Sequence, residues 1–294
     1  MKARTAVLLV GTILLAGLVA YVNVVGHGTT VHRSDSMSVV PLPASPLDAT
    51  YRINDEEVTL ADGVATRDAA PGSAAKVITS VFGTPIHGDL NGDGAPDAAV
   101  LLTQDGGGSG TFYYAAAALK DGDGYLGTNA VLLGDRIAPP TLEMRYGMLI
   151  ARYAAHGPDE PFTATATVAV SKYVTLSGAT LTDAGSFEEG ALVLPGTLTF
   201  EDETGTFSTC SGDTYTLSDD SRALAALRAV YVQRAGTEEG APVFVVVVGH
   251  VMDATADTAS GGGADSFAVT RILSAPADAS CGDDELLQGG APIE

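Results

Sequence analysis

Short runs of β-branched and aromatic residues recur along the chain from residue 51 onward, and clusters of Gly, Pro, Asn and Asp separate them. Runs of this length between turn residues are typical of β-strands. The clearest two are 98–104 and 111–119, which flank a glycine-rich turn and therefore predict a β-hairpin. The alanine-rich stretch 114–119 is short for a helix and follows aromatic residues, which favours a buried strand. We find no convincing helix between 51 and 182 and expect a β-rich domain there.

Further strands of this first region are predicted where apolar runs end at turn residues. They are 51–53, 57–60, 75–82, 129–133, 142–145, 148–153, 163–170 and 172–176, with Tyr146 and Gly147 as a tight turn. In the second half of the chain the strongest β pattern lies at 242–248, and strands are also expected at 191–200 and 266–273.

One helix is predicted in the second half, at 222–233. Leu224, Leu227 and Tyr231 recur there at helical spacing, and the residues 219–221 before it are of the type that caps helices. The pattern as a whole predicts a mostly β fold. It consists of two β-rich domains, antiparallel or barrel-like, with one short helix in the second domain.

The first 26 residues differ from the rest. Lys2 and Arg4 precede an uncharged run from residue 5 to 26, which is about the length that a spanning helix requires. The basic residues favour a cytoplasmic N-terminus, so the remainder of the chain is expected outside. A cleaved signal peptide is the alternative. Residues 15–18 resemble the bacterial lipoprotein box, but Leu18 stands where that box has its lipidated Cys.

These patterns predict five segments. Residues 1–26 form a signal anchor, or transmembrane helix, and the proline-containing stretch 27–48 is a disordered linker. Residues 49–184 form the first β-rich domain, and 190–282 form a small barrel-like domain with one helix. Residues 283–294 are an acidic tail.

Charge narrows the possible partners. The chain has 36 acidic and 15 basic residues, giving a formal net charge of -21, and no Trp. Binding of nucleic acid or anionic lipid relies on clustered Lys and Arg, so a nucleic-acid partner is not expected. Such a balance suits a secreted protein or a salt-adapted one.

The two cysteines, Cys210 and Cys281, form an even pair in a chain that carries export features. We expect a structural disulfide. A metal or redox site is disfavoured because neither cysteine has a Cys-x-x-Cys partner or a His at ligand spacing.

One loop has side-chain oxygens spaced for a hard cation. Calcium loops place carboxylates and amides at alternate positions of a tightly turning chain, with Gly at the sharpest point. Counting from position 1, the ligands expected here are the side chains at 1, 3, 5 and 9 and the carbonyl at 7: Asp89, Asn91, Asp93, Asp97 and Ala95. The sequence therefore predicts calcium, in a structural rather than a catalytic role. An Asp/Asn/Gly turn without an ion is the alternative.

The loop departs from helix-loop-helix calcium hands, because Val100 stands at position 12 and the flanks are strands. With its Gly-Asp-Leu-Asn-Gly-Asp-Gly-x-x-Asp sequence before an apolar strand, it resembles the calcium loop of FG-GAP repeats. That resemblance implies ligation by Asp89, Asn91, Asp93 and Asp97. There is no second full copy, and the similar stretch 121–124 is expected to be a plain turn.

Two longer stretches resemble bacterial envelope proteins. Residues 88–139 resemble a type of uncharacterised envelope lipoprotein. In the second domain, the stretches 196–200, 207–210 and 242–245 together with Tyr215 are similar to the small β-barrels of NlpE-like and META-type envelope proteins. The Cys-x-x-Cys pairs of NlpE-like proteins are missing, which puts cysteine-linked metal sensing in doubt.

The expected function is that of a non-enzymatic envelope protein. It is anchored in the inner membrane through its N-terminal helix, with the bulk of the chain periplasmic, and it binds an envelope protein or another extracytoplasmic ligand. Secretion after signal cleavage is the alternative location, and an extracytoplasmic hydrolase with an unrecognised site is the alternative function. No hydrolase motif occurs, and His87, His156 and His250 are scattered.

Overall fold

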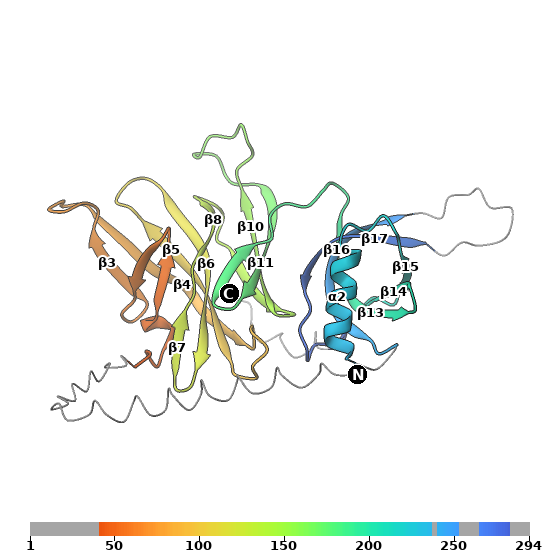
Figure 1. Cartoon of the computed structure of the whole chain (residues 1–294). Helices are drawn as coiled ribbons and strands as arrows, with labels where there is room; N and C mark the ends of the chain where they lie inside the picture. Colours follow the sequence, from red (N-terminus) through yellow and green to blue (C-terminus); the bar gives the residue numbers. More distant parts are fainter. Residues whose placement is uncertain (1–40, 237–239, 253–264, 283–294) are drawn as a thin grey trace, which may run out of the picture. The chain divides into compact units, whose positions relative to one another are not determined.

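A six-stranded antiparallel sheet occupies the first half of the computed structural model, which describes residues 41–236, 240–252 and 265–282 (Figure 1). Its strands follow the order β3-β4-β5-β6-β7, and β8 also pairs with β6. They are β3 (Val64–Asp68), β4 (Lys76–Gly88), β5 (Asp97–Asp105), β6 (Thr111–Asp121), β7 (Gly124–Gly127) and β8 (Val131–Asp135). The predicted hairpin is confirmed as β5 and β6, and 121–124 is the turn into β7.

The centre of this sheet is buried on both faces. Along β5, Ala98, Val100 and Leu102 belong to one core cluster, while Ala99 and Leu101 pack into clusters on the opposite face. Side chains of successive strand residues point to opposite faces, so a strand covered on both sides reads as one continuous apolar run. That is why the sequence shows no alternation here.

One face is covered by a small hairpin and by the turn before it. The hairpin consists of β1 (Thr50–Ile53) and β2 (Glu56–Thr59), and the 3-10 turn η1 (Pro46–Asp48) precedes it. Tyr51 is fully buried, and its hydroxyl donates to the carbonyl oxygen of Pro46 at 2.7 Å. The prediction of a disordered linker up to residue 48 is therefore wrong for 46–48, because a buried tyrosine holds them to the sheet.

A four-stranded sheet packs on the opposite face, in the order β12-β11-β10-β9. Its strands are β9 (Thr141–Arg145), β10 (Met148–Ala155), β11 (Val168–Ser177) and β12 (Thr180–Asp183). Tyr146 and Gly147 both have positive φ, which confirms the predicted tight turn. The two strands predicted at 163–170 and 172–176 are in fact the single strand β11, which pairs with β10 from Val168 onward.

The second half of the chain forms a closed five-stranded barrel, in the order β13-β14-β15-β17-β16. Its strands are β13 (Leu192–Glu201), β14 (Thr204–Thr209), β15 (Thr214–Leu217), β16 (Val243–Met252) and β17 (Ser266–Ser274). Every pairing is antiparallel except the short parallel pairing of β15 with β17, which closes the barrel. The mostly β class and a small barrel with one helix are thereby confirmed for the described residues.

Helix α2 (Leu224–Ala235) packs on the barrel core (Figure 1). Leu227 and Tyr231 are buried among the barrel's phenylalanines. The helix begins two residues later than predicted, and its N-cap residue, Ala223, makes no side-chain capping bond. Ser221, one of the expected capping residues, instead accepts a hydrogen bond from the backbone N–H of Val269 at 3.0 Å, and this bond ties the helix entrance to β17.

Two barrel glycines allow aromatic rings to lie against the backbone. A Cβ atom at Gly196 would lie 2.8 Å from the ring of Phe207, and one at Gly249 would lie 2.7 Å from the ring of Phe267. Those two rings stack with their centroids 5.7 Å apart. The barrel is narrow enough that its centre is filled by these rings.

A further apolar cluster joins the four-stranded sheet to the barrel. Met148 and Ile150 of β10 pack with Phe244 and Val246 of β16, and both cysteines lie at the edge of the cluster. The predicted disulfide is confirmed, because Cys210 and Cys281 are bonded with their Cα atoms 5.0 Å apart.

Three predicted segments lie wholly or largely outside the described residues. The anchor (1–26), most of the linker and the acidic tail (283–294) belong to the parts that the structure does not describe. Among the described residues, no helix is long and apolar enough to cross a membrane.

Candidate functional site: an acidic loop beside a cleft

The acidic loop connects β4 to β5. The two strands remain paired up to Gly88 and Asp97, so the ends of the loop are held side by side. Residues 89–96 therefore have to reverse the chain within a short span. Gly92 and Gly94 have φ values of 81° and 83°, which side chains with a Cβ rarely adopt.

Asp97 lies beneath the loop and is completely buried. Its carboxylate accepts hydrogen bonds from the backbone N–H groups of Leu90 (3.0 Å), Asn91 (3.3 Å) and Lys120 (2.8 Å). Burial raises the pKa of Asp97 above its ordinary value, although the three hydrogen bonds oppose that rise. This carboxylate joins the start of the loop to the end of β6.

Asp89 holds the middle of the loop. Its carboxylate oxygens accept from the backbone N–H groups of Gly92 (2.7 Å), Asp93 (3.2 Å) and Gly94 (2.8 Å). The chain therefore curls around this side chain, and the exposed residues at the tip depend on it for their position.

Asn91 and Asp93 occupy the exposed tip. The Asn91 amide donates to Asp93 at 2.9 Å, and the other oxygen of Asp93 accepts from the N–H of Ala95 at 2.7 Å. The bond from Ala95, and then the bond from Asn91, lower the pKa of Asp93. Asp93 is therefore a stable carboxylate that points into solvent.

The loop supplies the oxygen atoms that calcium prefers, but here they mostly serve the loop's own backbone. A carboxylate has about four lone-pair directions, and those of Asp89 and Asp97 are largely taken by N–H groups. Within residues 41–236, 240–252 and 265–282, no group of three or more His, Cys, Asp or Glu side chains is arranged to hold a metal ion. Calcium ligation by Asp89, Asn91, Asp93, Asp97 and the Ala95 carbonyl stays a prediction, and it requires the exposed side chains to turn.

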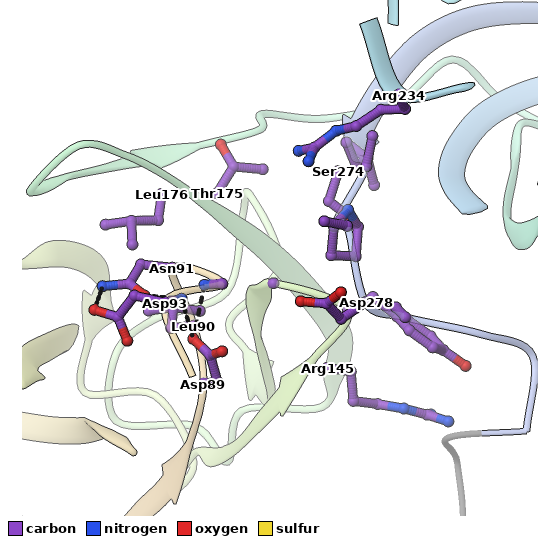
Figure 2. A pocket seen from close by; sticks show the side chains of 18 of the residues that line it. Asp89, Leu90, Asn91, Asp93, Arg145, Thr175, Leu176, Arg234, Ser274 and Asp278 are labelled. Carbon is purple, nitrogen blue, oxygen red and sulfur yellow. Dashed lines mark hydrogen bonds between the residues drawn. The ribbon is translucent and has the colours of Figure 1, made fainter. Parts of the chain in front are cut away.

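A cleft of about 710 Å³ opens beside the loop (Figure 2). Residues 89–93 form one wall, and residues 273–279, which follow β17, form the other. The rest of the lining comes from residues 145–147 at the turn between β9 and β10, from Thr175, Leu176 and Gly178 at the end of β11, and from Arg234 at the end of α2. The cleft is thus built from both sheets and the barrel, which explains why no single sequence motif marks it.

Two charged side chains face this cleft from the barrel side. Figure 2 shows the Asp278 carboxylate pointing toward the loop, and the Arg234 guanidinium extending over the cleft from the end of α2. Neither side chain has an ion pair or hydrogen bond within the part of the chain that the structure describes. No motif or spacing in the sequence singled out Asp278. A basic residue in the last turn of a helix is common enough that Arg234 did not stand out either.

The three histidines of the folded region lie apart from the cleft lining. His156 bonds through Nε2 to the carbonyl oxygen of Arg136 at 3.1 Å, and His250 lies 3.5 Å from the carboxylate of Glu188. His87 lies on β4 and pairs with Ala98 of β5.

Comparison with known proteins adds little to this geometry. No protein-family model matches the chain, and no curated protein matches it. A solved structure, the crystal structure of the Cpx pathway activator NlpE from Escherichia coli, is similar at 14% sequence identity and a TM-score of 0.24. The alignment covers 74% of this chain and 97% of that chain. At that TM-score the similarity supports no inference, so the proposals below rest on the geometry and the sequence of this chain.

Proposed function

We propose that this chain is a membrane-tethered, extracytoplasmic envelope protein that acts as a non-enzymatic binding module and uses its acidic loop as a structural calcium site. The observation that carries the proposal is the cleft whose wall is the acidic loop. Clefts of several hundred Å³ lined by apolar surface and a few polar groups are the usual form of small-molecule sites.

The location is supported by the cysteines and by the N-terminal pattern. The disulfide between Cys210 and Cys281 is of a kind that persists in oxidising compartments. The uncharged run behind Lys2 and Arg4 supplies the tether. Deleting residues 1–26 and directing the rest to the periplasm with an unrelated signal peptide is expected to move the protein from the membrane to the soluble fraction. Retention in the membrane would contradict the tether.

Binding is favoured over hydrolysis by the contacts of the histidines. Among the described residues, neither His156, which contacts a backbone carbonyl, nor His250, which contacts a carboxylate, is hydrogen-bonded to a Ser or Thr hydroxyl that it could activate, and neither lines the cleft. The cleft instead presents carboxylates and the guanidinium groups of Arg145 and Arg234, which are groups that orient charged ligands.

Calcium is tested by thermal unfolding of the compact unit 41–294. At a free calcium concentration about 100 times Kd, binding to the folded state stabilises it by about 2.7 kcal/mol. For a protein of this size, that shift raises Tm by roughly 5 °C or more. Asp93→Ala is expected to show no rise in Tm with calcium. Chelator is expected to lower the Tm of the parent and to leave that of Asp93→Ala unchanged.

Asp123→Ala is the matched control, because Asp123 is a carboxylate in the turn between β6 and β7. It is expected to keep the full calcium shift. A parent protein that melts at the same temperature in calcium and in chelator would exclude the calcium site.

A further inference from the structure

We infer that the cleft binds a short peptide-like zwitterion, with the carboxylate of the ligand at Arg234 and its ammonium group at Asp278. The inference rests on the proposed function as a binding module and names the chemistry of its ligand. It does not depend on whether the loop holds calcium.

Arg234 differs from the other two arginines at α2. Arg222 pairs with Glu188 at 2.9 Å, and Arg228 donates to the carbonyl of Glu203 and lies over the ring of Phe200. Arg234 has no such partner within the described residues, and its guanidinium extends over the cleft (Figure 2). A guanidinium fork binds a carboxylate through two parallel hydrogen bonds, which makes it the best available group for the anionic end of a ligand.

Asp278 supplies the opposite charge on the same wall. It lies three residues before Cys281, so the disulfide to Cys210 restrains the segment that carries it. Its carboxylate points across the cleft toward the loop, where Asp89 and Asp93 add negative potential (Figure 2). A cationic group placed there is attracted from both walls, and an ammonium group satisfies the carboxylate with hydrogen bonds as well as charge.

The lining between the two charges suits a short peptide. Leu176 and Pro276 provide apolar surface for small side chains, above the buried side chains of Leu90 and Leu273. Ser274 also lines the cleft. A simple anion or cation would satisfy only one end of this arrangement.

The experiment is isothermal titration of the full-length chain with alanine peptides of two to four residues. Each peptide is used with free termini, with an acetylated N-terminus and with an amidated C-terminus. We expect one length to bind best, because the ligand's two ends have to reach Arg234 at the end of α2 and Asp278 in the segment after β17 at the same time. We expect blocking either terminus of that peptide to weaken binding by about tenfold or more, as the loss of one charged contact implies. Equal binding of free and blocked peptides would overturn the inference.

Two variants test which residue binds which terminus of the peptide. Arg234→Gln is expected to remove the preference for a free carboxylate and to keep the preference for a free amine. Asp278→Asn is expected to do the reverse. The matched controls are Arg228→Gln, on the same helix but outside the cleft lining, and Asp220→Asn, an exposed carboxylate before the helix. Both controls are expected to bind like the parent.

The outcomes separate this inference from the calcium proposal. If no peptide binds, or if Arg234→Gln and Asp278→Asn bind all peptides like the parent, the inference is wrong, whatever the calcium melting curves show. The peptides could bind equally well in calcium and in chelator while the Tm of the parent is the same in both. In that case the calcium site is wrong and the inference stands.

Discussion

Replacing Asp97 with alanine is expected to cost far more stability than replacing any other carboxylate of the acidic loop. Its side chain is fully buried and bonds to the N–H groups of Leu90, Asn91 and Lys120. Alanine would leave all three donors without this acceptor. The loop would thereby lose its connection to the end of β6.

The magnitude follows from how far water can reach each donor. The N–H of Leu90 is buried, and leaving it unpaired costs about 2 kcal/mol. The other two bonds are partly buried, so water replaces part of each, at a loss of about 1 kcal/mol apiece. Removing a carboxylate whose burial is unfavourable, as its raised pKa indicates, offsets part of this loss. The net loss is about 3 kcal/mol, or roughly 8 °C in Tm for a protein of this size.

The assay is thermal and urea unfolding of the parent, Asp97→Ala and Asp93→Ala, each with calcium and with chelator. Asp93 is exposed, and its loss in chelator is expected to be small. The deficit of Asp97→Ala is expected to persist in chelator, because backbone amides rather than an ion create it. A loss for Asp97→Ala below about 1 kcal/mol in chelator would refute this reasoning, since exposed substitutions already reach about half that.

The pKa values of the same two carboxylates are shifted in opposite directions, so their effects on stability depend on pH with opposite sign. The pKa of Asp97 is raised by burial, so its contribution to stability is greatest below the ordinary Asp pKa and declines as pH rises through the folded value. The pKa of Asp93 is lowered by its hydrogen bonds, so its contribution is present at neutral pH and is lost as pH falls. Carbon-13 NMR of the carboxyl groups is expected to show Asp97 titrating above Asp93, and the reverse order would contradict these contacts.

Three further predictions concern the fold. Replacing Cys210 and Cys281 together with serine releases a crosslink that spans a sequence separation of 71, and it is expected to cost about 4 kcal/mol in non-reducing urea unfolding; equal stability of the variant and the parent would contradict this. Gly249→Ala places a Cβ 2.4 Å from a carbonyl oxygen of the facing strand and is expected to cost about 3 kcal/mol, whereas Gly106→Ala, in open space, is expected to be nearly neutral in the same assay. Tyr51→Phe removes the hydroxyl bonded to a carbonyl in the turn before β1 and is expected to lower stability by about 1.5 kcal/mol, and a wild-type melting curve would show that water already serves that carbonyl.

The sequence was sufficient to predict the strands that are buried on both faces, because their apolar runs end at clear turn residues. The hairpin of β5 and β6 and the turn at Tyr146 and Gly147 are the best examples. Prediction from the sequence failed where a tertiary contact overrides local composition. The proline-containing stretch before β1 is polar and looked disordered, yet the hydroxyl of Tyr51 holds it to the sheet. The N-cap of α2 was missed because Ser221 is used by β17 instead.

The candidate site was predictable only in part. The spacing of Asp89, Asn91 and Asp93 marked the loop, since those residue types at alternate positions are informative by themselves. The different role of Asp97 follows from its burial against the end of β6, which local spacing does not reveal. Arg234 and Asp278 come from a helix end and from a segment after the last strand, and only the closed barrel brings them to one cleft.

The order of the barrel strands has a consequence for synthesis of the chain. Strand β17 pairs with β16 on one side and with β15 on the other, so it is the strand that closes the barrel. Until Ser266–Ser274 has emerged from the ribosome, β15 and β16 each keep an unpaired edge that is able to join a strand of another molecule. Chains terminated before β17 are therefore expected to aggregate or to be degraded, whereas chains that end just after Ser274 are able to close the barrel even without the disulfide.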